Sequence, residues 1–213
     1  MTQRFERALA HVLGAEGGLA DHPDDPGGLT NHGVTQRTYN GWRKQNDLEP
    51  RSVREITDPE VTAIYRSDFW EPMKGDKLPD GLAFVVFDGA VNSGVAQSVK
   101  WLQRALGVVD DGIVGSITLS AARDADVPAV IDDICDQRLA FMQDLDTWPI
   151  FGDGWSARVA RVRVQGKAWA RTGTVPTSDV PALPPEARPK AEGRRANWLK
   201  RVIRAILRMI KGG

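Results

Sequence analysis

Hydrophobic residues recur at helical spacing along most of the chain. At the start, Phe5, Ala8, Leu9, Val12 and Leu13 follow the i, i+3, i+4, i+7, i+8 pattern of one apolar helix face. Comparable patterns predict further helices at about 57–69, 82–91, 95–106, 116–124, 127–145 and 155–170. The sequence therefore predicts a mostly α fold, with the dense apolar run at 82–91 in the centre of the core.

The segment after the first helix has a different composition. Residues 19–35 are rich in glycine, proline and aspartate and show little periodicity. Such a composition favours turns, so we expect a loop with a small β-hairpin. The next helix has a clear start, because Thr57-Asp58-Pro59-Glu60 has the spacing of a capping box with proline in the first turn.

The composition changes again after position 172. Five of the 13 prolines lie between residues 173 and 193, which predicts a semi-extended linker. Residues 194–213 then predict an amphipathic helix with Trp198 on its apolar side and its cations within about one quadrant of the helical wheel. The cations on that face are Lys200, Arg201, Arg204, Arg208 and Lys211. We therefore expect a folded domain at 1–172, a linker at 173–193 and a cationic helix at 194–213.

Charge is distributed unevenly between these parts. The chain has 28 basic and 28 acidic residues, which gives a formal net charge of +0. Residues 194–213 hold seven basic residues and no acidic one, so residues 1–193 have 21 basic residues against 28 acidic ones. An acidic body does not favour nucleic acid as a partner, and the cationic helix needs a separate explanation.

Three further features of the sequence concern disulfide and zinc binding, membrane insertion and secretion. The single cysteine, Cys135, excludes a disulfide framework and a cysteine-based zinc site, and its apolar neighbours predict a buried core thiol. No apolar run approaches the roughly 20 residues that cross a bilayer. The first residues include two acids and no small-residue cleavage site, so we expect no secretory signal and synthesis in the cytoplasm.

The stretch from Glu16 to Thr35 carries the most informative chemistry. Glu16 is expected at the C-terminal end of the first helix, where the helix dipole and apolar surroundings raise the pKa of a carboxyl group. A carboxylic acid that is still protonated near neutrality can protonate a leaving oxygen. Asp25 follows nine residues later and can fold back opposite Glu16, while Thr30 and Thr35 offer hydroxyl groups that can position a water. This combination is typical of an inverting glycosidase, whose two carboxyl groups lie about 6.5–9.5 Å apart.

Other interpretations of this stretch stay open. Clusters of aspartate, glycine and proline usually form turns, so Asp24 and Asp25 can serve only as turn caps, and Asp21 and Asp24 compete with Asp25 for the catalytic role. A metal site formed by these aspartates with His22 and His32 is disfavoured, because the spacing matches no recognised ligand pattern. We therefore expect neither a metal nor a cofactor.

Several separated motifs follow one another along residues 1–170. Glu-Gly-Gly at 16–18 precedes Asp-Pro-Gly-Gly-x-Thr-x-x-Gly-x-Thr at 25–35, and Tyr-Arg-Ser-Asp-Phe-Trp follows at 65–70. Phe-Asp-Gly-Ala-Val-Asn-Ser-Gly stands at 87–94 and Trp-Leu-Gln-Arg-Ala-Leu-Gly at 101–107. In this order the motifs resemble the bacterial and phage N-acetylmuramidases of glycoside hydrolase family 108.

This resemblance implies a lysozyme-like helical domain at 1–172 that hydrolyses the β-1,4 bond after N-acetylmuramic acid in peptidoglycan. The family's catalytic glutamate maps onto Glu16, while Leu19 stands where the family usually has tyrosine. Val-Asp-Asp-Gly-Ile-Val-Gly at 109–115 fits the segment that the family shares with predicted peptidoglycan-binding domains, so 95–172 is expected to include such a segment. A looser resemblance to phage lysozymes matches Asp25 but places Thr30 one residue early, which leaves Thr30 and Thr35 in competition.

Further residues are candidates for the substrate cleft or the core. Tyr39 and Trp42 follow the loop in a polar segment and are candidates for stacking on a sugar. Asn92 precedes Ser93-Gly94, where its side chain either faces the sugar or caps the helix. Asp88 is expected to be a buried carboxylate with satisfied partners.

The cationic helix is expected to lie in a membrane interface. It combines a basic face with a broad apolar face that includes Trp198. Its roughly 15 residues would extend about 22 Å, too short for the ~30 Å of hydrocarbon in a bilayer. We expect it to bind anionic membranes or lipopolysaccharide, and the alternative is that it docks onto the acidic body.

The leading hypothesis is therefore a monomeric phage endolysin, an antimicrobial lysozyme that leaves the host cytoplasm through a holin-type pore. A lytic transglycosylase is the first alternative, since it needs Glu16 and no second carboxylate. The second alternative is a non-catalytic protein that binds the wall or disturbs membranes. A muramidase that serves a secretion system would share the chemistry of the endolysin.

Overall fold

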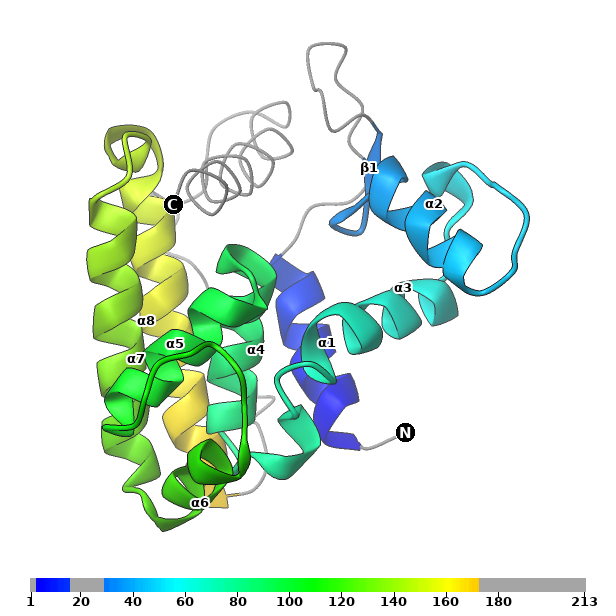
Figure 1. Ribbon diagram of the computed structural model, residues 1–213. Coiled ribbons are helices and arrows are strands. Elements are labelled where there is room, and N and C mark those ends of the chain that lie inside the picture. Colours follow the sequence, from blue (N-terminus) through cyan, green and yellow to red (C-terminus); the bar gives the residue numbers. More distant parts are fainter. Residues whose placement is uncertain (1–2, 16–28, 173–213) are drawn as a thin grey trace. The chain divides into compact units, whose positions relative to one another are not determined.

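The computed structural model in Figure 1 describes residues 3–15 and 29–172. Several predictions of the sequence analysis lie outside the described residues. They concern Glu16, Leu19, Asp21, His22, Asp24, Asp25, the linker at 173–193 and the cationic helix at 194–213.

The described chain is built mainly from α-helices, as predicted. These are α1 (Gln3–Ala15), α2 (Gln36–Gln45), α3 (Asp58–Tyr65), α4 (Leu82–Ser93), α5 (Val95–Ala105), α6 (Ser116–Asp124), α7 (Val127–Gln143) and α8 (Trp148–Thr172). Shorter helical turns are η1 (Val53–Glu55), η2 (Arg66–Trp70) and η3 (Gly75–Lys77). Strands β1 (Thr30–Asn31) and β2 (Val34–Thr35) form the predicted small antiparallel hairpin. None of the described helices is both long enough and apolar enough to cross a membrane.

The chain folds into two compact units. Of the described residues, the first unit contains 3–8, which begin α1, and 69–172. The second unit runs from Leu9 to Asp68 and holds the rest of α1, the hairpin, α2 and α3.

Helix α4 is the centre of the first unit because it is apolar around almost its whole circumference. All of its residues from Leu82 to Ser93 are buried. Helices α5, α7 and α8 pack against it, and α7 and α8 lie side by side (Figure 1). The predicted central position of this helix is confirmed.

Two glycines allow α4 and α8 to approach closely. Gly81 caps the start of α4 with a φ of 82°, and a Cβ atom there would clash with the backbone carbonyl of Gly166. A Cβ atom at Gly166 would in turn clash with the side chain of Val85. The helices therefore meet through backbone at this point, which only glycine permits.

The apolar core of the first unit surrounds a buried charge. Asp88 projects from α4 and forms ion pairs with Arg138 of α7, at 2.7 Å, and with Arg158 of α8, at 2.8 Å. Burial alone would raise the pKa of this carboxyl group, but the two guanidinium groups lower it to about 2. The prediction that Asp88 is a satisfied buried carboxylate is confirmed.

Cys135 lies on α7 in the same interior. Its thiol is buried, and burial raises the pKa of the thiol to about 11. The thiol is therefore protonated and inert at neutral pH, as expected for a core residue.

Some element boundaries differ from the prediction. The helix that starts at Asp58 ends at Tyr65, and the chain continues through the π-helical turn η2. This turn brings Trp70 into the core, where its ring centroid lies 5.3 Å from that of Phe5 and 5.4 Å from that of Phe87. Helix α2 was not predicted, because its segment is mostly polar and buries only Tyr39 and Arg43.

Replacing Asp88 with asparagine tests the buried charge network. The variant keeps the shape of the side chain but leaves two buried guanidinium groups without a counter-charge, so we expect a loss of about 3–5 kcal/mol in unfolding free energy. Because the folded-state pKa of about 2 lies below the usual 3.8, the carboxylate contributes fully above about pH 4. Its contribution is lost as the pH falls toward 2, and Asp88→Asn should lack this acid-dependent decline.

Denaturant unfolding at several pH values measures both effects. Asp110→Asn is the matched control, since Asp110 pairs with Arg104 at the surface and its loss should change stability little. Equal unfolding midpoints for the two variants would contradict the role of Asp88.

Candidate active site

In sequence, described residues directly precede and directly follow the segment that carries the predicted active site. Helix α1 ends at Ala15, directly before Glu16. The next residue that the structure describes is Leu29, directly before the hairpin. The part of the site that the structure describes is therefore the hairpin and the residues that hold it.

The hairpin has a two-residue turn of the kind that matches strand twist. Thr30 pairs with Thr35 and Asn31 pairs with Val34, so His32 and Gly33 form the turn. Both turn residues have positive φ, 47° and 74°, which is the signature of a type I′ turn. Positive φ is unfavourable for histidine, and the hydroxyl of Tyr65 stabilises this turn by donating to the His32 carbonyl at 3.0 Å.

Thr30 and Thr35 lie next to each other on one face of the hairpin, because they are directly opposite in the strand register. The hydroxyl of Thr35 caps α2 by accepting a hydrogen bond from the Thr38 backbone N–H at 3.1 Å. It also lies 3.0 Å from the hydroxyl of Thr38. Of the two threonines that the sequence could not separate, Thr35 has a structural role as a helix cap, and the Thr30 side chain is buried.

Two carboxamide side chains attach the hairpin to the loop before α3. Asn31 donates to the Val53 carbonyl at 3.2 Å. Gln36 donates to the Arg51 carbonyl at 2.9 Å and accepts from the Val53 N–H at 2.7 Å. The sequence analysis missed both residues, because an amide side chain that bonds a distant backbone has no local sequence signal.

Tyr39 was predicted to stack on a sugar, and its placement contradicts that prediction. Its ring is fully buried within the second unit. Its hydroxyl donates to Glu60 at 3.0 Å and accepts from Arg43 at 3.0 Å and from Arg51 at 2.7 Å. Tyr39 therefore joins α2, α3 and the intervening loop, and has no exposed face for a substrate.

Glu60 is the acidic partner in this cluster. It accepts a hydrogen bond from the Thr57 backbone N–H at 2.9 Å, which confirms the predicted capping box. It also pairs with Arg43 at 2.8 Å and with Arg51. Partial burial raises the pKa of Glu60, but the hydrogen bonds from Thr57 and Tyr39 and the charge of Arg51 outweigh it, so the pKa is lowered.

Trp42 is the remaining aromatic candidate for sugar contact. Its ring lies nearly parallel to that of Tyr39, with an interplanar angle of 10° and centroids 6.4 Å apart. Unlike Tyr39, Trp42 is only partly buried. The buried ring of Tyr39 therefore stacks with the ring of Trp42, which is the partly exposed aromatic surface of the pair.

Asn92 does not fit either of its predicted roles. It lies within α4 and is buried, while Gly94 is the residue that caps the helix. Its side-chain oxygen accepts a hydrogen bond from Arg138 at 3.0 Å, which extends the Asp88 network. A contact between Asn92 and a sugar would require the removal of this interior packing.

Residues 3–15 and 29–172 contain no group of three acidic, histidine or cysteine side chains that could hold a metal ion.

Comparisons with known proteins agree on one assignment. Residues 9–94 match the family model described as Glycosyl hydrolase 108, and residues 97–160 match the model described as Predicted Peptidoglycan domain. The structure of SagA from Brucella abortus is 41% identical in sequence to this chain, with a TM-score of 0.69. That similarity covers 78% of this chain and 95% of the SagA chain. A comparison with curated proteins gave no match.

Replacing Tyr39 with phenylalanine distinguishes a structural role from sugar stacking. The variant keeps the ring but removes a buried hydroxyl that has three charged partners, so we expect the unfolding free energy to fall by about 1–3 kcal/mol. Thermal unfolding measures the change, with Arg37→Ala as a control at an exposed position of the same helix. If Tyr39 stacked on a sugar, phenylalanine would preserve the contact and stability would be unchanged.

Proposed function

The chain belongs to the glycosyl hydrolase 108 family, a family of N-acetylmuramidases, and on this premise we propose that it cleaves the β-1,4 bond between N-acetylmuramic acid and N-acetylglucosamine. Family membership makes it a glycoside hydrolase with a mostly α, lysozyme-like fold. The match at residues 97–160 makes peptidoglycan its partner. The finer proposal concerns the residues that perform the reaction.

Glu16 is the general acid in this proposal. The observation that supports it most directly is the position of Glu16 immediately after α1, within the family match at 9–94. The C-terminal end of a helix carries partial negative charge and α1 has no basic residue in its last turn, so the protonated form of a carboxyl group is favoured there. A protonated Glu16 donates its proton to the glycosidic oxygen as the bond breaks.

Asp25 and Thr30 complete the proposed set. Asp25 acts as the general base that activates a water on the opposite face of the sugar ring. Thr30 positions this water in the proposal, and Thr35, whose hydroxyl caps α2, is the alternative. The hydrogen bonds from Asn31 and Gln36 to the neighbouring loop support this role, because they fix the strand that carries Thr30.

The cationic helix at 194–213 extends the proposal to the membrane. Its basic face would bind anionic lipid or lipopolysaccharide, and Trp198 with the other apolar residues would enter the interface. We propose that this helix helps the enzyme to pass an outer membrane and reach peptidoglycan. As a phage endolysin, the enzyme would be made in the host cytoplasm and reach the wall through a holin-type pore.

Substitution of Glu16 with glutamine tests the general acid. The amide cannot supply the proton, so we expect peptidoglycan hydrolysis to fall by about 10²- to 10⁴-fold. Clearing of a suspension of purified walls measures the rate, and Glu6→Gln is the control at an exposed position of α1. Asp25→Asn should also lose activity if a second carboxylate is required.

The masses of the released fragments identify the reaction. Hydrolysis gives reducing ends, whereas a lytic transglycosylase gives anhydro-sugars. Full activity of Glu16→Gln would remove the proposed mechanism, and anhydro-sugar products would replace it with transglycosylation.

Deletion of residues 194–213 tests the membrane role. We expect the shortened protein to lose the ability to release dye from vesicles of anionic lipid, because it lacks the basic and apolar faces together. A full-length variant with glutamine in place of the five cations on the basic face separates charge from apolar contact. Unchanged leakage after the deletion would remove this part of the proposal.

A further inference from the structure

A group of exposed branched side chains extends from the loop after α5 into the first turn of α6. Val109 is 81% exposed, Ile113 69% and Ile117 73%. The other large apolar side chains that the described residues expose lie elsewhere, at Leu48, Ile150 and Val164. Single exposed apolar residues are common, whereas three within nine positions are a candidate for a binding surface. We refer to Val109, Ile113 and Ile117 as the 109–117 surface.

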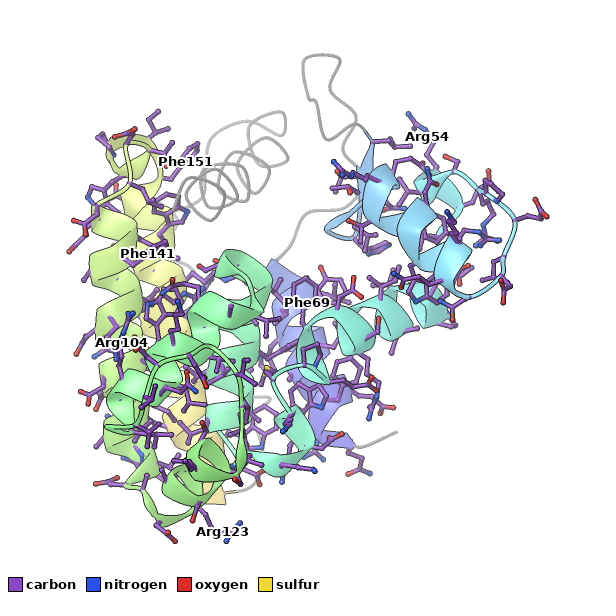
Figure 2. The ribbon with its side chains drawn as sticks, viewed as in Figure 1. Arg54, Phe69, Arg104, Arg123, Phe141 and Phe151 are labelled. Carbon is purple, nitrogen blue, oxygen red and sulfur yellow. The ribbon has the colours of Figure 1, made fainter. Side chains whose placement is uncertain are left out.

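The start of this segment is fixed by the end of α5. Gly107 has a φ of 65°, and its N–H donates to the Arg104 carbonyl at 3.0 Å. The N–H of Val108 donates to the Gln103 carbonyl at 3.0 Å, which completes a Schellman motif. Arg104, labelled in Figure 2, then holds Asp110 through an ion pair at 2.6 Å.

The middle of the segment is held by one buried amide. Gln103 projects from α5 and donates to the Asp111 carboxylate at 2.8 Å and to the Ile113 carbonyl at 3.0 Å. Its oxygen accepts from the Gly112 N–H at 2.8 Å. The same amide lies 3.2 Å from the hydroxyl of Thr118 on α6. One side chain therefore connects the loop with both neighbouring helices.

Other side chains of this segment are buried in the interior of the unit. Val114 and Thr118 are buried, directly next to the exposed Ile113 and Ile117. The apolar side chains therefore point outward from a backbone that is anchored on its other side. A fixed surface loses little conformational entropy when it binds a partner, so this arrangement favours recognition.

We propose that the 109–117 surface binds the stem peptides of peptidoglycan. The surface lies within residues 97–160, which match the predicted peptidoglycan domain, and the proposal rests on the proposed function. Aromatic residues, the usual platforms for sugar rings, are absent from positions 102–140. Branched aliphatic side chains instead suit the methyl groups of alanine-containing peptides. Arg104 is already paired with Asp110, so Lys100, whose charge also acts on Asp110, is the nearby cation that can attract the carboxylates of such peptides.

Sedimentation with purified peptidoglycan sacculi tests this proposal on the full chain. The measurements use a Glu16→Gln background, which prevents digestion, and high ionic strength, which screens the cationic helix. Val109→Thr, Ile113→Thr and Ile117→Thr are combined, because threonine keeps the branched shape and removes apolar surface. We expect the triple variant to bind intact sacculi about tenfold more weakly. Val164→Thr, at a 63% exposed position outside the matched segment, should bind like the parent.

A second substrate identifies the part of the wall that is recognised. Sacculi whose stem peptides have been removed by an amidase should bind the parent about as weakly as intact sacculi bind the triple variant. Equal binding of parent and triple variant to intact sacculi would overturn the proposed surface. Undiminished binding of the parent to stripped sacculi would overturn the assignment to stem peptides. Matching thermal unfolding midpoints exclude misfolding as the cause of weaker binding.

This experiment is independent of the hydrolase mechanism. Wall clearing by the active enzyme, measured separately, tests the chemistry of Glu16. If the parent chain with Glu16 intact failed to clear walls while the triple variant still lost sacculus binding, the proposed hydrolase function would be overturned and the surface supported.

Discussion

A carboxylate can be buried in an apolar interior only if opposite charges accompany it, and this constraint organises the first unit. Asp88 lies on α4, the most apolar of the described helices, and the groups that stabilise it come from α7 and α8. The ion pairs therefore require all three helices to be present in one register. Apolar packing can tolerate small shifts between helices. A buried ion pair cannot, because a charge that loses its partner is left uncompensated in the interior. The network extends to Asn92 through Arg138, so the end of α4 is fixed by the same charges.

The second unit also holds a carboxylate between two guanidinium groups, but it has fewer apolar side chains around them. Glu60 is the carboxylate, Arg43 and Arg51 are the guanidinium groups, and the Tyr39 hydroxyl lies among them. Helix α2 is mostly polar and has little apolar surface with which to pack, so these charged contacts hold it against α3. The hairpin depends on this frame, because Gln36 and Asn31 bond to the loop that Arg51 helps to fix. The position of Thr30 is thus determined by charges some distance away along the chain.

The sequence could predict features that local chemistry determines. The helices at 82–93, 95–105 and 116–124 follow from apolar periodicity, and the hairpin follows from turn-forming residues. Glu60 was identifiable as a capping residue from its distance to Thr57 alone. Partners that are distant in sequence could not be predicted. Nothing near Asp88 points to Arg158, which lies 70 residues further on.

The errors at Tyr39 and Asn92 have the same physical origin. Each residue stands in a local sequence that favours exposure, a polar segment for Tyr39 and a helix end for Asn92. Each is drawn inward by arginines, Tyr39 by Arg43 of its own helix and by Arg51 of the next loop. Asn92 is bonded by Arg138 of α7. Glu16 and Asp25 stay predictions, founded on the family match and on the helix that precedes Glu16.

The sealed thiol of Cys135 has a consequence for the redox chemistry of the folded chain. In an oxidising environment a reactive thiol would couple two molecules or form mixed disulfides. A pKa of about 11 and a buried position keep this sulfur protonated and out of reach of oxidants. The folded enzyme can therefore change redox environment without any change in its covalent structure.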